Sequence, residues 1–410
     1  MTTDSIRAVR SPQPAAATGP SRTRLPLVVY VLAVGTFLML TTEFVVAGIL
    51  PQVAADLQIS LAQAGRLITV FAAGMIIGAP AMALLTMRMS KRLTLIAAML
   101  IFVAGHVAVA LGSDFAVLLG ARFVTAVATG AFWAVSAVVA TRAAGAASGA
   151  RALGVVTAGG ALATVLGVPI GAFIAQAGGW RSTFWFLAVA AVIATVLVAR
   201  LVPADDPTGP VTSLRRELGG LRSGRLWLAL SACVTTTGGV LAAYSYIAPI
   251  LTEQGGVEAG FVPLVLTAFG IGSFIGTVLG GRFGDRHPGP VTVLTPAVTI
   301  AILAAIGVTT GAPLIMTGLV VLLGLFGLSA NGVLIHLVVR SAGAAATLGS
   351  ALAVSAFNAG TAIGTAIAGA AMSTPLGVHG PATVGAFIVA LTLIPTIALA
   401  VPRHRSRDRF

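Results

Sequence analysis

The chain has 410 residues, of which 57% are hydrophobic and only 9% are charged, and its mean hydropathy is +1.03. A water-exposed surface needs far more charge, so this composition excludes a soluble globular protein and indicates an integral membrane protein. The formal charge of +13 is scattered along the chain and forms no basic patch with interleaved aromatics, which argues against nucleic-acid binding. The single cysteine, Cys233, excludes a disulfide framework and a cysteine-based metal site.

Twelve apolar stretches, each about 20 residues or longer, are long enough to cross a bilayer. They predict an all-α membrane protein with twelve transmembrane helices. The stretches are 26–50, 61–87, 93–112, 115–141, 149–174, 181–202, 226–250, 260–281, 291–310, 313–334, 346–370 and 381–402.

A hydrophilic segment at 203–225 divides the stretches into two groups of six, so we expect two six-helix halves at 25–202 and 226–402 joined by a linker. A polar tail at 1–24, expected to be disordered, and a basic tail at 403–410 flank them. No small-residue cleavage site follows the first apolar stretch, so we expect it to be retained rather than removed as a signal peptide.

The basic residues predict the orientation of the chain in the membrane. Of the 24 lysines and arginines, 21 fall in the tails and loops on one side, and only Arg66, Arg122 and Arg181 do not. Because cytoplasmic loops are enriched in basic residues, both termini are predicted to be cytoplasmic. Lys91 is the only lysine beside 23 arginines, which indicates a GC-rich bacterial source and hence a location in the bacterial plasma membrane.

Glu43 interrupts the first apolar stretch. An ionisable group in hydrocarbon is costly, so it is a functional-site hypothesis by default. Glu43 lies seven residues before Leu50 on an outward-running helix, and Arg122 lies seven residues after Phe115 on an inward-running one. At about 1.5 Å per residue, both lie roughly 10 Å below the outer boundary. The sequence therefore permits the two groups to interact.

Two interpretations of Glu43 and Arg122 remain open. Burial disfavours a charged carboxylate and a neighbouring guanidinium favours it, so Glu43 can alternate between protonated and ionised forms. In this interpretation Glu43 binds a proton or a cationic group of the substrate, and Arg122 stabilises its ionised form. In the other interpretation, the two residues form a fixed structural pair that restricts helix register.

The fourth stretch carries polar or large side chains at three- or four-residue spacing, which places them on one helix face. These residues are Arg122, Thr125, Thr129, Trp133 and Ser136. We expect this stripe to face water rather than lipid.

Several motifs resemble those of a known transporter family. The loop after the eighth stretch, from Gly281 to Asp285 and Arg286, is a GxxxDR pattern, and the equivalent loop after the second stretch keeps only Arg88. With six plus six helices, this resembles the major facilitator superfamily. Further segments resemble the twelve-span drug:proton antiporter family, in the branch of sugar-efflux, arabinose-efflux-like and chloramphenicol-resistance exporters. Those segments are 41–44, 48–51, 56–57, 122–133, 167–171, 179–185 and 244–249.

The resemblance implies two pseudo-symmetric halves, with the first, fourth, seventh and tenth helices lining a central cavity beside Glu43 and Arg122. Aromatic walls with a few polar groups suit a drug-sized ligand. The candidate substrate contacts are Thr42, Thr125, Thr129, Trp133, Tyr244, Tyr246, Asn331 and Asn358. Ordinary packing of the aromatics and interhelical hydrogen bonding of the amides are the alternatives.

Further residues point to conformational roles. Gly167, Pro169 and Gly171 belong to a glycine-rich fifth stretch that is predicted to be thin and kinkable, although close packing alone would also explain them. Arg88, Asp285 and Arg286 are expected to act in gating at the cytoplasmic helix ends. His106 and His336 are weaker candidates for a proton relay.

The sequence contains neither a GxxxxGK[ST] phosphate loop nor an HExxH motif, so no enzyme is predicted and no cofactor is expected beyond the proton gradient as an energy source. The predicted function is secondary active export of a small hydrophobic or amphipathic compound, such as an amphenicol antibiotic, by proton antiport with alternating access. A sugar or nucleoside efflux permease, a facilitator or importer, and a non-transporting sensor or scaffold are alternatives. The expected partners are a small-molecule substrate, protons and the lipid bilayer, and the protein is expected to function as a monomer.

Overall fold

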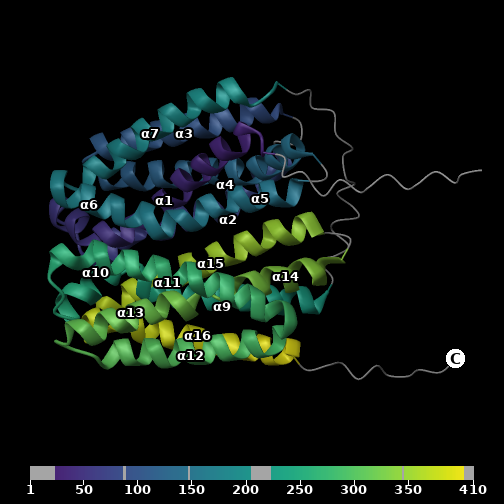
Figure 1. The fold of residues 1–410 in the computed structure, drawn as a ribbon. Coiled ribbons are helices and arrows are strands. Elements are labelled where there is room, and N and C mark those ends of the chain that lie inside the picture. The colour runs from purple at the N-terminus through teal and green to yellow at the C-terminus, as the bar shows by residue number, and fades with distance from the viewer. Residues whose placement is uncertain (1–23, 86–88, 146–147, 205–222, 344–345, 401–410) are drawn as a thin grey trace, which may run out of the picture.

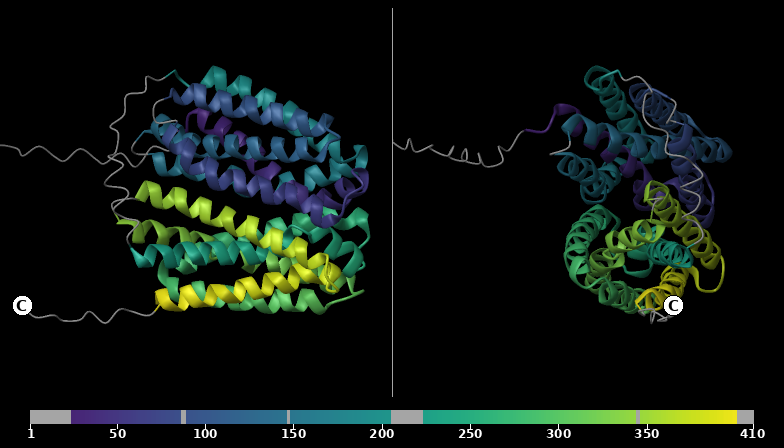
Figure 2. Two further views of the ribbon diagram at one scale, coloured as in Figure 1. Left: turned by 180° about the vertical axis from the view of Figure 1, so that it is seen from behind. Right: turned by 90° about the vertical axis from the view of Figure 1, so that its right-hand side faces the viewer.

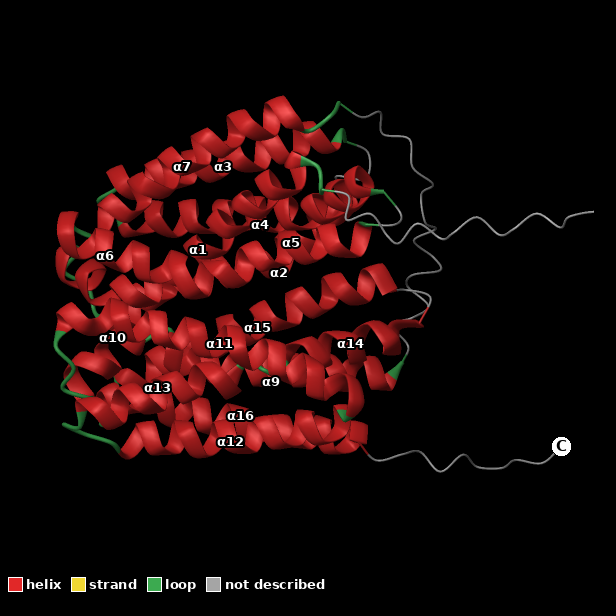
Figure 3. Cartoon of the chain, in the orientation of Figure 1, coloured by secondary structure: helices red, strands yellow, loops and turns green. Residues whose placement is uncertain are grey.

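The computed structural model describes residues 24–85, 89–145, 148–204, 223–343 and 346–400. Within these ranges every regular element is a helix (Figure 3). Twelve helical segments there are long and apolar enough to cross a membrane, and they coincide with the twelve predicted stretches. The predicted tails and most of the predicted linker lie outside the described residues.

The first six spans form the N-terminal half, the upper layer of Figure 1. The fifth span consists of two α-helices joined by a π-helical turn. The elements are α1 (Leu27–Asp56), α2 (Leu61–Leu85), α3 (Lys91–Leu111), α4 (Phe115–Ala144), α5 (Gly149–Leu162), the π-helical turn Ala163–Gly167, α6 (Val168–Gly178) and α7 (Trp180–Leu201).

The remaining spans form the C-terminal half, the lower layer of Figure 1. The seventh span continues beyond α9 through short helical segments. The elements are α9 (Gly224–Tyr244), α10 (Ile247–Pro249), the π-helical turn Ile250–Gln254, the 3₁₀ turn Ala259–Phe261, α11 (Val262–Arg286), α12 (Pro288–Val308), α13 (Pro313–Gly327), α14 (Asn331–Ala342), α15 (Ala346–Met372), the 3₁₀ turn Gly377–His379 and α16 (Gly380–Ala400).

The glycines of the fifth span allow it to pack backbone-close against α1. A Cβ atom at Gly159 would lie 2.2 Å from the carbonyl oxygen of Ala33, and one at Gly167 would lie 2.0 Å from Thr41 Oγ1. The π-helical turn ends at Gly167, directly before the helix that carries Pro169. A π-helical turn locally breaks the α-helical hydrogen-bond register. The predicted irregularity of this span is therefore present as a π-helical turn.

The tenth span is interrupted, whereas the sequence predicted one continuous stretch at 313–334. Helix α13 ends at Gly327 and α14 begins at Asn331. Around the break, this span packs closely on the neighbouring α11, where Gly276 and Gly280 have no side chains. A Cβ atom at these positions would lie 1.9 Å from the Leu325 carbonyl oxygen and 2.1 Å from that of Ser329. Backbone contact with glycine thus accommodates the break.

The two halves share an apolar core at the end of the bundle away from the termini. One cluster combines residues of both halves, among them Leu50 of α1 and Leu266 of α11. At the end that carries the termini, the halves have separate clusters, one around Met99 and one around Leu334. The two layers are visible from behind and end-on in Figure 2. The described structure is therefore closed between the halves at the far end.

Candidate functional site

Arg122 is buried in the interior of the N-terminal half, with 1% of its surface exposed. Its Nη1 donates to the carbonyl oxygen of Thr42 at 3.0 Å and to Thr42 Oγ1 at 2.9 Å, and Nε donates to the Leu67 carbonyl at 3.4 Å. The guanidinium also lies 4.2 Å from the centroid of the Phe71 ring. Partners on α1 and α2 thus hold this α4 side chain in one orientation, as hydrogen bonding and a cation–π contact favour.

Thr42 connects Arg122 to His106 of α3. Thr42 Oγ1 lies 2.8 Å from His106 Nε2, and His106 Nδ1 lies 2.7 Å from the Phe102 carbonyl oxygen. Because a carbonyl only accepts, Nδ1 carries the ring proton and Nε2 of the neutral ring accepts from the threonine. Thr42 Oγ1 therefore accepts from Arg122 and donates to His106. The chain of hydrogen bonds is complete with a neutral imidazole.

The imidazole of His106 is enclosed by aromatic rings. It stacks on Phe102 with a centroid distance of 3.9 Å and lies 5.8 Å from the Phe184 ring. The sequence made His106 only a weaker candidate for a proton relay. The structure instead connects it to Arg122 through a single hydroxyl group.

Glu43 lies next to this network but does not join it. The residue is half-buried, and no described residue donates a hydrogen bond to its carboxylate or forms an ion pair with it. The charges of Glu43 and Arg122 interact through space, but the two groups are not in contact as a salt bridge. In the described conformation, an arginine held in one orientation therefore lies beside a carboxylate that has no hydrogen-bond or ion-pair partner among the described residues.

Arg122 itself retains an unused donor, because its Nη2 is buried without a hydrogen-bond partner. Buried polar groups are normally hydrogen-bonded, and an exception calls for an explanation. Nη2 of Arg122 and the carboxylate of Glu43 are thus two polar groups of this site that have no hydrogen-bond partner among the described residues. Either group can form a hydrogen bond with a water molecule or a polar group of a ligand while the bonds of Nη1 and Nε hold Arg122 in place.

The threonines of the α4 stripe do not line a wet face in this structure, which corrects that expectation. Thr125 Oγ1 donates to Ala121 O of its own helix, and Thr129 Oγ1 donates to the Thr125 carbonyl. Both are buried, Thr125 against Gly105 of α3 and Thr129 against α1. Close helix packing decides this, because Gly105 of α3 and Met39 of α1 cover the two hydroxyl groups. Trp133, in contrast, is half-buried.

Tyr246 is a packing residue rather than a ligand contact in this structure, which corrects its assignment to substrate binding. Its hydroxyl donates to the Thr365 carbonyl at 3.2 Å. The ring tip fills the space left by Gly65 of α2 and Gly369 of α15, where a Cβ atom would lie 2.1 and 2.4 Å from Tyr246 Oη. Tyr246 thus joins the two halves at the closed end.

Three other candidates on the C-terminal half carry polar atoms that lack partners. The Tyr244 hydroxyl and the Oδ1 atoms of Asn331 and Asn358 are buried without a hydrogen bond. Tyr244 packs on Phe44 of α1 and on Phe269 of α11, with ring centroids 6.3 and 4.6 Å away. Asn331 begins α14, directly after the break in the tenth span. These atoms are available to hydrogen-bond a ligand.

Comparison with known proteins identifies the family. Residues 32–342 match the family model described as Major Facilitator Superfamily. The chain belongs to this superfamily. It is 34% identical over 373 residues to a "Chloramphenicol resistance protein" of Streptomyces lividans, covering 90% of this chain and 95% of the relative. It is 31% identical over 369 residues to the "Inner membrane transport protein YdhP" of Escherichia coli (strain K12), covering 88% and 93%.

Solved structures support the same fold. A bacterial homologue of the human lysosomal transporter Spinster, in an inward-facing and occupied conformation, aligns with a TM-score of 0.70 at 16% identity, over 91% of this chain and 95% of that one. The transporter FucP, in the outward conformation, aligns with a TM-score of 0.59 at 18% identity, over 91% and 100%. The protein is therefore a multi-pass membrane transporter of the superfamily, and it is not an enzyme.

The predicted gating residues of this superfamily member are distributed between its two halves. Gly167, Pro169 and Gly171 lie around the end of the π-helical turn, buried against α1. Asp285 and Arg286 are exposed at the end of α11 that lies near the termini, and Arg88 lies outside the described residues. The geometry brings the glycine and proline residues into the helix contact, while the side chains of Asp285 and Arg286 form no hydrogen bond or ion pair with another described residue. His336 is exposed on α14.

Two features of the transporter were missed by the sequence reasoning. Leu67 and Phe71, which hold Arg122, are ordinary apolar residues of α2 and gave no signal. The second feature is an ion pair between Arg181 and Asp56, which Trp180 Nε1 supports with a hydrogen bond to Asp56 Oδ2 at 3.2 Å. Arg181 was visible as one of the three basic residues outside the cytoplasmic loops, but its pairing with Asp56 requires α1 and α7 to be neighbours.

Proposed function

We propose that this transporter exports a small amphipathic compound of the chloramphenicol type in exchange for protons. The observation that carries the proposal is the site around Arg122, where the half-buried Glu43 carboxylate has no fixed partner beside an arginine that is anchored through Nη1 and Nε. The likeness to a chloramphenicol resistance protein along 90% of the chain supports the substrate class.

Glu43 is the proton carrier in this proposal. A carboxylate in a partly buried position is neutral or charged according to its hydration and the approach of a cation. The free Nη2 of Arg122 favours the ionised form when Glu43 approaches it, and loss of that contact favours protonation. A change of conformation that alters their separation thereby binds or releases a proton.

Alternating access supplies that change of conformation. The two halves share one core at the far end and have separate cores at the end with the termini. Exchange requires the far-end contacts to open while contacts form at the other end. The contact between Tyr246 of the C-terminal half and Gly65 of α2 is among the contacts that must separate.

The test is transport in proteoliposomes of purified full-length protein. An imposed pH gradient is expected to drive accumulation of labelled chloramphenicol, and addition of chloramphenicol is expected to dissipate the gradient. The variant Glu43→Gln should lose gradient-driven accumulation but retain exchange of labelled for unlabelled substrate. The matched control is Glu253→Gln, an exposed carboxylate, which should behave as the wild type.

Full gradient-driven transport by Glu43→Gln would refute the coupling role. If chloramphenicol neither accumulates nor affects the gradient, the substrate assignment fails, and the same assay with sugars and nucleosides tests the alternative efflux permease. Downhill transport that is indifferent to pH in the wild type would indicate a facilitator.

A further inference from the structure

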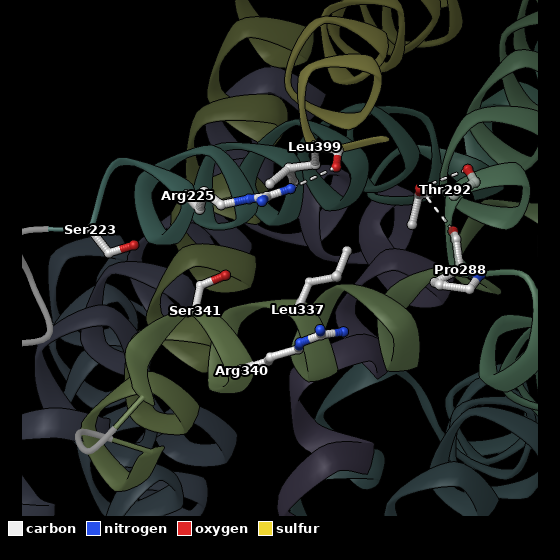
Figure 4. A pocket seen from close by; sticks show the side chains of 9 residues that line it. Ser223, Arg225, Pro288, Thr292, Leu337, Arg340, Ser341 and Leu399 are labelled. Carbon is white, nitrogen blue, oxygen red and sulfur yellow. Dashed lines mark hydrogen bonds between the residues drawn. The ribbon is translucent and has the colours of Figure 1, made fainter. Parts of the chain in front are cut away.

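A pocket of about 460 Å³ lies in the C-terminal half, away from the site around Arg122. It lies where α9, α12, α14 and α16 meet, at the end of the bundle that carries the termini (Figures 1 and 4). The arginine distribution predicts this end to be cytoplasmic. None of its lining residues is among the candidate substrate contacts. The pocket therefore needs an explanation separate from the transport site.

Two arginines from opposite walls supply the charge of this pocket. Arg225, in the first turn of α9, and Arg340, in the last turn of α14, extend their guanidinium groups into the space between the helices (Figure 4). Among the described residues, no aspartate or glutamate lines the pocket. Arg225 uses one amine to donate to the Leu399 carbonyl at 3.0 Å, and no described residue accepts from Arg340. Among the described residues, two positive charges thus face one cavity without a counter-charge.

The other polar groups of the pocket are mainly donors. Ser223 and Ser341 present hydroxyl groups beside the two arginines. Gly289 lies in the first turn of α12, where backbone amides have no intrahelical acceptor, and its proline neighbours have no amide hydrogen at all. The Thr292 hydroxyl, in contrast, is already bonded within α12 to the Pro288 and Gly289 carbonyls, both at 3.0 Å.

We propose that this pocket binds a phosphate-bearing anion between Arg225 and Arg340. Guanidinium groups match the oxygens of phosphate in geometry and charge, and hydroxyl and amide donors complete such a site. Leu337 and Leu399 form an apolar part of the wall, which suits the glycerol or acyl portion of a larger ligand. The ligand is either the headgroup of an anionic phospholipid or a soluble phosphate compound, because both offer the same chemistry.

The position of the pocket suits both sources. It lies at a bilayer boundary, since Arg225 lies in the first turn of the transmembrane helix α9 and Trp227, 57% exposed, follows within the same turn. Tryptophan is enriched at membrane interfaces, and anionic lipids attract basic residues at the cytoplasmic leaflet. The proposal is independent of the transported substrate.

The test uses purified full-length protein in a neutral detergent. Thermal unfolding is measured against inorganic phosphate, with chloride at equal ionic strength as the reference, and against dioctanoyl phosphatidylglycerol, with dioctanoyl phosphatidylcholine as the reference. The variants are Arg225→Gln and Arg340→Gln. The control is Arg200→Gln. Arg200 is an exposed arginine near the end of α7 in the N-terminal half, at the same end of the bundle as the pocket.

We expect a saturable rise of the unfolding temperature with at least one of the two phosphate probes, retained in Arg200→Gln. In Arg340→Gln the binding should weaken about tenfold or more, as expected for loss of one charge-assisted hydrogen bond. Because Arg225 also bonds the Leu399 carbonyl, native mass spectrometry of bound phosphatidylglycerol provides a second measurement for Arg225→Gln if that variant unfolds early.

The two probes distinguish the sources of phosphate. A response to phosphatidylglycerol alone identifies a lipid headgroup site, and a response to inorganic phosphate identifies a site open to soluble compounds. The proposal is overturned if neither probe exceeds its reference, or if the pocket variants respond as strongly as Arg200→Gln.

Discussion

Replacing Thr42 by valine removes one oxygen atom from the centre of the Arg122 network and leaves the shape of the side chain almost unchanged. Thr42 Oγ1 accepts from Arg122 Nη1 at 2.9 Å and lies 2.8 Å from His106 Nε2. Both interactions disappear in the variant. Arg122 Nη1 keeps the carbonyl of residue 42 as a partner. His106 Nε2, in contrast, loses its hydrogen-bond donor and stays buried.

The expected cost follows from these contacts. A buried polar atom that loses its partner costs about 1–3 kcal/mol, and a hydrogen bond to a charged group contributes about 1.5–3 kcal/mol. Since Arg122 keeps one of the two acceptors for Nη1, we expect a total loss of about 2–3 kcal/mol. If this loss falls on the transport cycle, the rate of proton-driven transport decreases by about 30- to 150-fold.

The matched control is Thr36→Val on the same helix. Thr36 is fully buried, but its hydroxyl donates only to the Leu32 carbonyl of its own helix at 2.9 Å, which the helix backbone also satisfies. Thermal unfolding measures the structural cost in both variants, and proteoliposome assays compare proton-driven transport with substrate exchange. Thr42→Val should lose proton-driven transport more than exchange. Equal stability and equal coupling in Thr42→Val and Thr36→Val would refute the positioning role of Thr42.

Two further predictions concern Arg122 and Gly167. Arg122→Lys should abolish proton-driven transport although the charge is retained, because the single nitrogen of lysine cannot take the separate positions of Nη1 and Nε or present a planar group to the Phe71 ring; wild-type rates in proteoliposomes would contradict this. Gly167→Leu should reduce transport and destabilise the protein by at least about 1–3 kcal/mol, since its Cβ atom would lie 2.0 Å from Thr41 Oγ1. Gly154→Leu is the control for both transport and stability, because a Cβ atom at Gly154 meets nothing within 4 Å. Equal effects of Gly167→Leu and Gly154→Leu would exclude a role for the contact between Gly167 and α1.

The polar candidates show how far sequence reasoning reached. The depth argument placed Glu43 and Arg122 at the same level, and their charges interact in the structure. The depth argument could not predict whether Glu43 forms an ion pair with Arg122 or stays unpaired, because this depends on which acceptors the neighbouring helices offer to Arg122. The structure supplies the carbonyls of Thr42 and Leu67, and backbone acceptors carry no sequence signature.

Spacing along one helix was a weaker guide. Thr125 and Thr129 share a face with Arg122, but glycine on α3 and methionine on α1 cover them. Tyr246 was read as an aromatic wall, but Gly65 and Gly369, far away in the sequence, form the space that it fills. Helical periodicity defines a face, whereas the partner of that face is set by the arrangement of several helices.

The sequence by itself determined the membrane class, the twelve spans and, through its motifs, the superfamily, because hydrophobic length and local patterns are properties of contiguous residues. Only the tertiary structure decided what surrounds each polar group. The chain around the break before Asn331 packs on glycines of α11, and the chain of hydrogen bonds from Arg122 through Thr42 to His106 joins three helices. The pocket between Arg225 and Arg340 likewise exists only where the ends of four helices meet. Such sites are made by long-range packing, which a linear pattern does not encode locally.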